Sequence, residues 1–230
     1  TVNSSAVVQL TNALTLGTAS NPASSLIVNG TLDAQAFSPA VLGGNSGTFS
    51  LASGATLITA NTNGIVSGTN GTISTSVGTR TFNAAANYTF DGAANQTANF
   101  VNTTLNNLTI ANTSGTVSLN ATLTINNVTI NSGGGSLTAG SVTHLVSGNW
   151  TNNGGTFVPG TGTISLNGTS QTIGGTSSSI NFNNLSLSNG TKTFNKPAAI
   201  GGNLSIASGA LANFGSLTTN TAGTLTLGGA

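Results

Sequence analysis

Short triplets that alternate apolar and hydroxyl residues recur along almost the whole sequence. They are Leu14-Thr15-Leu16, Leu108-Thr109-Ile110, Val117-Ser118-Leu119, Leu123-Thr124-Ile125, Val128-Thr129-Ile130, Ile164-Ser165-Leu166, Leu185-Ser186-Leu187, Leu204-Ser205-Ile206 and Leu225-Thr226-Leu227. Because successive side chains of a strand point to opposite faces, each triplet would bury two aliphatic side chains and expose one Ser or Thr. Gly, Asn and Ser separate the triplets and favour turns. The pattern predicts an all-β protein.

Strands of three to five residues are short for a sandwich and suit a solenoid, in which neighbouring coils supply the pairing. The triplets that start at residues 108 and 128 lie 20 residues apart, and an Asn-Asn-apolar-hydroxyl-apolar motif occurs at 106–110, 126–130 and 183–187. We therefore expect a parallel β-helix of about 11 or 12 coils of roughly 20 residues, about 55 Å long, with Asn side chains stacked as amide ladders. The inward residues should include Leu108, Ile110, Val117, Leu119, Leu123, Ile125, Leu185, Leu187, Leu204 and Ile206.

A longer repeat overlies the coils. Ser50–Ala55 matches Ser205–Ala210, and Phe90-Asp91-Gly92 with Gln96 resembles Leu166-Asn167-Gly168 with Gln171. Matches such as the one between Phe90–Gly92 and Leu166–Gly168 lie about 75 to 79 residues apart. We expect a single solenoid over 1–230, built from three degenerate copies of about 77 residues at approximately 1–75, 76–150 and 151–230.

Charge is almost absent, and this excludes several functions. Among 230 residues, Lys and Arg number 3 and Asp and Glu number 2, with a net charge of +1, no Cys and no Met. Nucleic-acid binding needs rows of Lys and Arg, and disulfides and thiolate metal sites need Cys. No apolar run approaches the roughly 18 residues of a membrane-spanning helix, and residues 1–20 carry no signal-peptide pattern. We predict no nucleic-acid partner and no membrane insertion.

The two carboxylates do not suggest an active site. Glycoside hydrolysis ordinarily uses two carboxylates that flank one bond. Asp33 and Asp91 are 58 residues apart, which predicts a separation of about three coils, or about 14 Å. Both residues are better explained as turn residues that bind backbone N–H groups. We predict that the protein is not an enzyme and has no catalytic residues.

The remaining ionisable residues point to structural roles. His144 has no second His, Cys or acid nearby in the sequence, so neither a metal site nor a cofactor is predicted. Arg80 is expected at a strand edge with a solvated charge. Lys192 and Lys196 flank Phe194 and are predicted to oppose edge-to-edge pairing, with a basic ligand patch as the weaker alternative. The hydroxyl residues are too irregular for an ice-binding face, and acidic Ca²⁺ loops are missing.

Four segments carry a resemblance to a known group of proteins. They are Gly47–Leu57, Arg80–Gly92, Asn106–Ile110 and Gly148–Phe157. Together they resemble the Gly/Asn/Thr-rich repeats of very large secreted surface proteins of Bacteroidota-type bacteria, whose architecture is similar to that of filamentous-haemagglutinin-like adhesins. The resemblance covers the chain from about residue 10 and implies a β-helix at the cell surface without catalytic residues. Members often end in a sorting domain that this sequence lacks, which suggests a fragment, a processed product or another export route.

Two functional hypotheses follow. Neither end has a polar capping segment, because the strand pattern already starts at Ala6–Leu10 and runs to Leu225–Leu227. The first hypothesis is an extracellular structural protein, which forms a fibre, sheath or adhesin stalk by end-to-end stacking or by continuation into a longer repeat chain. The second is a module that binds glycans or surfaces through a side face. Trp150 and Tyr88 are its first candidate residues, although packing in the core is favoured for both.

Overall fold

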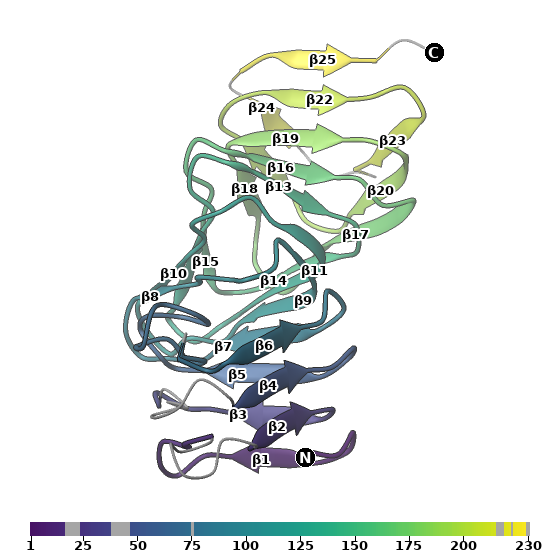
Figure 1. Cartoon of the computed structure of the whole chain (residues 1–230). Coiled ribbons are helices and arrows are strands. Elements are labelled where there is room, and N and C mark those ends of the chain that lie inside the picture. Colours follow the sequence, from purple (N-terminus) through teal and green to yellow (C-terminus); the bar gives the residue numbers. More distant parts are fainter. Residues whose placement is uncertain (17–23, 38–46, 75, 215–218, 222, 229–230) are drawn as a thin grey trace.

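The chain forms a tall stack of short strands, seen side-on in Figure 1. The computed structural model describes all residues except 17–23, 38–46, 75, 215–218, 222 and 229–230. Parallel strands, with no helix among the described residues, stack as a β-solenoid of about nine turns with roughly 21 residues per turn. The predicted fold class is therefore confirmed.

One column of strands runs along the whole stack and is called the first column here. Its members follow one another in parallel register, with Tyr88 opposite Leu108, Leu108 opposite Val128 and Val128 opposite Trp150. The column consists of β1 (Val7–Gln9), β3 (Thr31–Asp33), β5 (Thr56–Thr59), β7 (Asn87–Phe90), the second half of β9 (Thr104–Ile110), the second half of β11 (Thr124–Asn131), β14 (Trp150–Asn153), β17 (Ser170–Gly174), β20 (Gly190–Phe194) and β23 (Ala210–Asn213).

A second column lies beside it. It begins with β2 (Ser25–Val28), β4 (Thr48–Leu51) and β6 (Thr79–Phe82), and continues through the first halves of β9 and β11 into β13 (Thr143–Val146), β16 (Thr163–Leu166), β19 (Asn184–Leu187), β22 (Leu204–Ile206) and β25 (Leu225–Leu227). Asn102, just before β9, donates its Nδ2 to the carbonyl oxygen of Phe82 at the end of β6.

The two columns merge into one sheet at β9 and β11. These strands have 7 and 8 residues, whereas most others have three or four. In β11, Thr124 and Ile125 pair with β13 of the second column, and Val128–Asn131 pair with β14 of the first. The corner between the columns is thus straightened for two turns, which explains why the Asn-Asn motif lies inside a strand at 106–107 and 126–127 and not in a turn.

The third side of the stack is regular only from the middle onwards. There it consists of β8 (Gln96–Thr97), β10 (Thr116–Ser118), β12 (Ser136–Thr138) and β15 (Thr156–Val158), followed by β18 (Ile180–Phe182), β21 (Ala198–Ile200) and β24 (Thr219–Thr221). Near the N-terminus no strand of this side is present among the described residues, and the turns that start at Val7, Thr31 and Thr56 take 24, 25 and 31 residues. Because these turns are longer than the predicted 20 residues, the chain completes about nine turns and not 11 or 12.

Inward side chains form one continuous apolar core. Of the ten residues predicted to face inward, nine are buried, with exposures between 0% and 7%. The exception is Ile206, which is only partly buried. Only one described strand of its column, β25, lies beyond it. The triplet Leu14-Thr15-Leu16 forms no strand, although Leu16 is buried at 7% exposure.

Asparagine side chains bridge the turns, as predicted. Asn127 donates its Nδ2 to Oδ1 of Asn107 at 2.8 Å, and Asn107 donates its Nδ2 to Oδ1 of Asn87 at 2.8 Å. Asn126 and Asn106 form a parallel pair at 2.9 Å. Each amide is donor and acceptor at once, so a stack of them satisfies both groups along the axis.

The ladder gives the first testable prediction. Asn107→Ala removes a donor to Asn87 and an acceptor from Asn127, so it should lower the free energy of unfolding by about 1–2 kcal/mol. Thr109→Ala in the same strand is the control, because this outward side chain spans no such ladder, and it should change stability by less than about 0.5 kcal/mol. Guanidinium unfolding followed by circular dichroism measures both, and equal effects would contradict a stabilising ladder.

Candidate functional site

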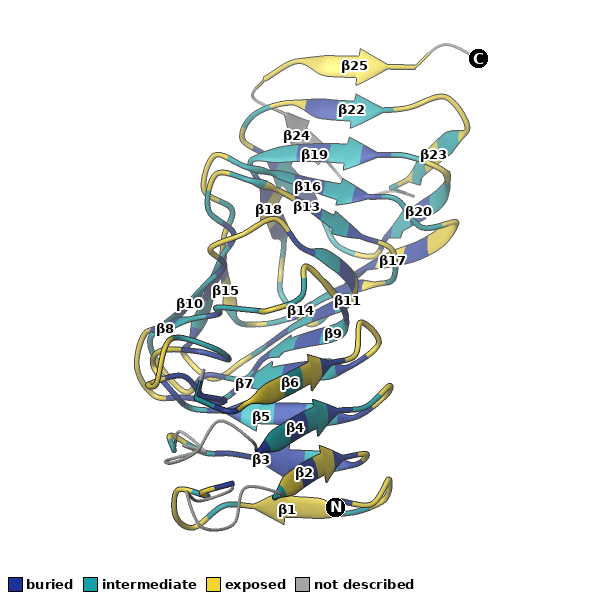
Figure 2. Cartoon of the chain, in the orientation of Figure 1, coloured by how far each residue is buried: buried dark blue, intermediate teal, exposed yellow. Residues whose placement is uncertain are grey.

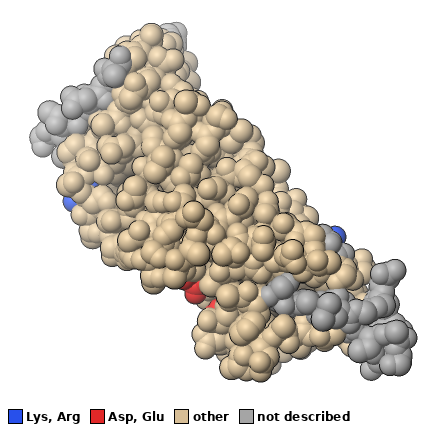
Figure 3. Space-filling model, turned by 90° about the vertical axis from the view of Figure 1, so that its left-hand side faces the viewer, with Lys and Arg blue, Asp and Glu red and all other residues tan. Residues whose placement is uncertain are grey.

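The two carboxylates lie closer together than the sequence suggested. Asp33 is opposite Ile58, and Ile58 is opposite Thr89, two residues before Asp91. The two Asp residues are therefore two turns apart, about 10 Å along the stack, and not three, because the intervening turns are long. Figure 3 shows the acidic residues as one small red area on an otherwise nearly uncharged surface.

Hydrogen bonding ties Asp33 to its neighbours. Its Oδ2 accepts from Nε2 of Gln9 at 2.8 Å and of Gln35 at 2.7 Å, and its Oδ1 accepts from the backbone N–H of Gln35 at 3.1 Å. Asp91 has a buried Oδ1 without a hydrogen-bond partner. Burial, reinforced by the charge of Asp33, raises the pKa of Asp91. The prediction that such Asp residues bind backbone N–H groups is correct for Asp33.

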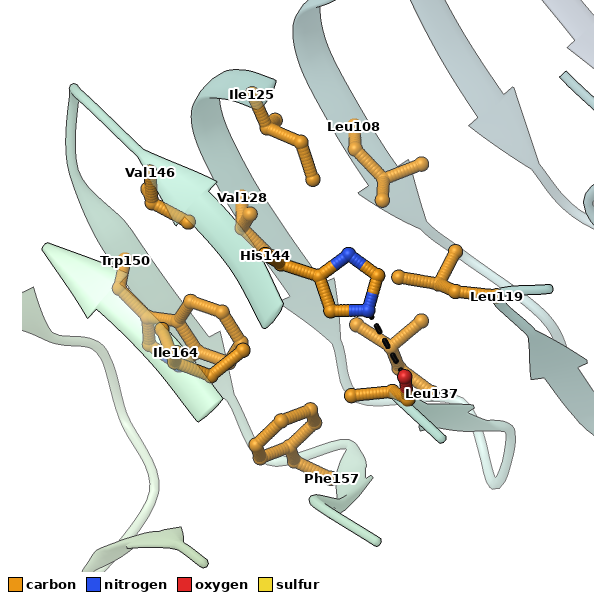
Figure 4. Close-up of a pocket in the computed structure, with 11 residues that line it drawn as sticks. Leu108, Leu119, Ile125, Val128, Leu137, His144, Val146, Trp150, Phe157 and Ile164 are labelled. Carbon is orange, nitrogen blue, oxygen red and sulfur yellow. Dashed lines mark hydrogen bonds between the residues drawn. The ribbon is translucent and has the colours of Figure 1, made fainter. Parts of the chain in front are cut away.

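His144 lies in the core beside a cavity of about 10 Å³ (Figure 4). Its Nε2 is 2.8 Å from the carbonyl oxygen of Ala139, and its Nδ1 accepts the backbone N–H of Leu123 at 3.3 Å. This arrangement requires the neutral imidazole with the proton on Nε2. Burial lowers the pKa of His144. The cavity, lined otherwise by apolar side chains, has room for about one water molecule at most, so it is no ligand site.

Lys192 is not a surface residue, which makes its predicted role against edge pairing wrong. Its side chain is 0% exposed, and its Nζ donates to the carbonyl oxygens of Gly168 at 2.6 Å, of Ser188 at 2.9 Å and of Asn189. Burial lowers the pKa of Lys192. The lysine lies at a corner of the solenoid, where its buried side chain donates to three backbone carbonyl oxygens.

Two glutamine side chains also form hydrogen bonds with backbone groups at corners of other turns. Gln171, opposite Lys192 in the neighbouring strand, donates its Nε2 to the carbonyl oxygens of Val146 at 2.9 Å and of Gly148, and accepts the N–H of Gly168 at 2.8 Å. Gln96 likewise donates to the carbonyl oxygens of Thr59 and Asn61 and accepts the N–H of Gly92. Polar corner residues are thus part of the core, a role that the alternating pattern does not reveal.

The other two cations differ in their surroundings. Arg80 lies within β6, opposite the buried Phe49, and donates from Nη1 to the carbonyl oxygen of Ser74 at 3.4 Å. Because β6 is the outer strand of the sheet β2–β4–β6, the predicted position at a strand edge is correct, although the side chain is half-buried and not fully solvated. Lys196 is half-buried in the connection between β20 and β21.

Neither aromatic residue proposed for a glycan-binding face is on the surface. Tyr88 is 3% exposed and Trp150 is 2% exposed, and burial raises the pKa of Tyr88. Trp150 packs against Phe157 with ring centroids 4.8 Å apart, and against Phe182 at 5.4 Å. Both residues therefore belong to the core.

The strands at the two ends of the stack, β1 and β25, have exposed apolar side chains (Figure 2). Leu225 and Leu227 continue the inward rows of Leu204 and Ile206, yet they are 55% and 66% exposed. At the other end, Val8 is opposite the buried Leu32 and is 39% exposed. The register places these side chains in the inward rows that form the core elsewhere in the stack. They are nevertheless exposed, because no described strand lies beyond them.

The free edge of β25 also has unpaired backbone groups. The N–H of Leu204 donates to the carbonyl oxygen of Thr224, and the N–H of Gly228 donates to that of Ile206. In a parallel ladder alternate residues point to opposite neighbours, so the N–H and C=O groups of Leu225 and Leu227 point away from β22. The end therefore offers both hydrogen-bonding groups and apolar side chains to a further strand.

No family model, no curated protein and no solved structure matches this chain. The described part of the chain holds no group of three or more His, Cys, Asp or Glu placed to bind a metal ion. Nor does it hold a helix long and apolar enough to cross a membrane.

Protonation of His144 should make stability depend on pH. Its pKa is lowered in the folded state, so below about pH 6.5 the unfolded chain binds more protons and stability falls as the pH decreases. Protonated Nδ1 would also face the N–H of Leu123, donor against donor. We expect a loss of up to about 1.4 kcal/mol per pH unit between about pH 6.5 and pH 5.

The variant His144→Leu tests this assignment. It should be less stable than the natural chain at neutral pH, because Ala139 and Leu123 lose a partner, but its stability should change less on acidification. Guanidinium unfolding of both proteins at the two pH values gives the comparison. An identical acid-induced loss in both would show that another group is responsible.

Lys192→Gln should stabilise the protein. Glutamine supplies donors in the equivalent place one turn earlier and avoids burying a charge without a carboxylate partner, so we expect a gain of about 1–2 kcal/mol at neutral pH. The lowered pKa of Lys192 means that this gain shrinks as the pH rises towards about 10.

Two further variants complete the test. Lys192→Leu removes the charge and all donors, and it should destabilise the chain because the carbonyls of Gly168 and Ser188 lose their partner. Lys196→Gln makes the same charge change in a half-buried turn and should have little effect. If Lys192→Gln is less stable than the natural protein, the cationic donor is required at this corner.

Proposed function

We propose that this protein is a non-catalytic structural component of an extracellular or bacterial cell surface. Its solenoid would form, or contribute to, a fibre, a sheath or the stalk of an adhesin by pairing coils end to end. The observation that carries the proposal is the exposure of inward-row residues at both ends, with Leu225 at 55%, Leu227 at 66% and Val8 at 39%.

The contact would be head-to-tail. At the C-terminal end the last described strands are β23 in the first column and β25 in the second. At the N-terminal end β1 is outermost in the first column, and Val2 forms a bridge to Val28 in the second. Stacking in register therefore places β1 of the next copy on β23, and Val2 of the next copy on β25. From the strand pattern of the sequence alone, we would expect the coil around Leu225 and Leu227 to pair with the coil around Val7 and Leu10 of the next copy, and the two columns give a different register.

Such a contact joins two different surfaces and adds each copy along the axis of the stack, so it does not close into a ring. Repetition would give open filaments, and further turns of a longer chain would use the same edges. The near absence of charge supports assembly, since a net charge of +1 gives little repulsion between copies. Among the described residues no paired acid and base supports an enzymatic role, and the outward surface is mainly hydroxyl and amide.

Substitution at the C-terminal edge tests the proposal. Leu225→Lys places a charge in the row that would be buried on stacking, and it should weaken association at least about tenfold. Thr226→Lys adds the same charge in the same strand on an outward side chain, and it should leave association almost unchanged. Sedimentation velocity over a range of concentrations and negative-stain images measure the assembly.

Circular dichroism should show that both variants keep the β-structure of the natural chain. If the natural chain stays monomeric at high concentration, or if both lysine variants associate equally well, end-to-end stacking is wrong.

A further inference from the structure

A polar cleft opens on the side of the solenoid, where the first column turns into the third. It has a volume of about 340 Å³ and is lined by Asn152, Gly154, Gly155, Thr156, Phe157, Ser177, Ser178, Ser179 and Asn181. The cleft exists because neighbouring turns connect these columns differently. Two residues, 154–155, join β14 to β15, whereas five, 175–179, join β17 to β18, and three, 195–197, join β20 to β21.

The short connection depends on glycine. Gly154 has a φ of 106°, a conformation that other residues rarely adopt, and the chain therefore turns sharply from β14 into β15. The longer loop above it is held at its base, where the N–H of Ser177 donates to the carbonyl oxygen of Asn152 at 3.0 Å. Its serines line the cleft together with Gly154 and Gly155.

Asn152 presents an unused donor to this cleft. The residue is 5% exposed, and its Oδ1 accepts the N–H of Gly154 at 3.0 Å, which fixes the orientation of the amide. Its Nδ2 makes no hydrogen bond to the described residues and is not sealed from the surface. Because Asn152 lines the cleft and its Nδ2 is accessible, this donor is available to a molecule bound there.

One aromatic residue is among those that line the cleft. Phe157 lines it and is 8% exposed, and behind it Trp150 packs at 4.8 Å. Figure 4 shows Phe157 and Trp150 side by side from the core. The lining residues thus offer hydroxyl, amide and backbone groups without any charge, together with one aromatic residue.

We propose that this cleft binds a short neutral saccharide. A sugar has both an array of hydroxyl groups for the Ser and Asn side chains and an apolar C–H face for Phe157, and the volume lies in the range of small-molecule sites. A charged ligand would find no counter-ion among the lining residues. The cleft lies on the side of the stack and remains open when the ends are paired, so this inference does not depend on the proposed structural role.

The test is a titration of the isotopically labelled natural chain, followed by two-dimensional NMR of the backbone amides. The probes are chitobiose, cellobiose, maltose and methyl α-mannoside at millimolar concentrations. At least one should shift the amides of Gly154, Gly155 and the 177–181 segment in a saturable way, with no comparable shifts at the ends of the stack.

Three variants locate the site. Ser179→Trp fills the cleft and should abolish the saturable shifts, whereas Thr176→Trp adds the same ring at an exposed position of the same loop that does not line the cleft, and should bind as the natural chain does. Asn152→Asp keeps an acceptor for the N–H of Gly154 but removes the donor, and should weaken binding about tenfold.

Circular dichroism and melting temperatures establish that the variants are folded before their binding is compared. The absence of saturable shifts in the cleft with all four probes overturns the proposal. So does undiminished binding by a folded Ser179→Trp variant.

Discussion

Parallel pairing of each turn with the next is the constraint on which the rest of this structure depends. A parallel ladder fixes the register of successive turns, so residues about 21 positions apart share a row. Apolar residues in inward rows then form one core, and Asn residues that share a row form ladders. At the corners, some backbone carbonyl oxygens are not bonded by the ladder and accept from side chains. Gln96, Gln171 and Lys192 satisfy these groups, so the interior is more polar than its strands alone suggest.

The same constraint explains why charge matters so little here. Pairing and burial in a solenoid are local to neighbouring turns, and both proceed with neutral side chains. Two of the few ionisable side chains are buried, His144 in the core and Lys192 at a corner. At the first and last described turns, apolar side chains of the inward rows and alternate backbone groups have no described strand beyond them. These exposed side chains and unpaired backbone groups link the fold to the proposed function. The cleft at Asn152 shows separately that a longer loop in one turn is enough to create a pocket on the side of the solenoid.

The sequence predicted the fold class and nearly all of the inward rows, because strict alternation of apolar and hydroxyl residues is typical of half-buried strands and does not fit a helix. It did not predict the long strands β9 and β11, since an Asn-Asn pair normally indicates a turn and only register with adjacent turns keeps it extended. Lys192 was misplaced for a related reason. A lone lysine beside a strand is usually solvated, and only the position of Gln171 one turn away shows that this row points inward. The cleft was missed because it arises from the difference between two loops, 154–155 and 175–179, and not from a motif.

Hydrogen exchange followed by mass spectrometry tests the central claim, that stability comes from turn-on-turn pairing, most directly. In a solenoid whose turns pair only with their neighbours, terminal turns open first. At concentrations low enough to keep the chain monomeric, protection should be greatest in the middle, around β9, β11, β13 and β16, and should fall progressively towards β1 and β25. Uniform protection along the chain, or the strongest protection in the terminal strands of the monomer, would contradict this account.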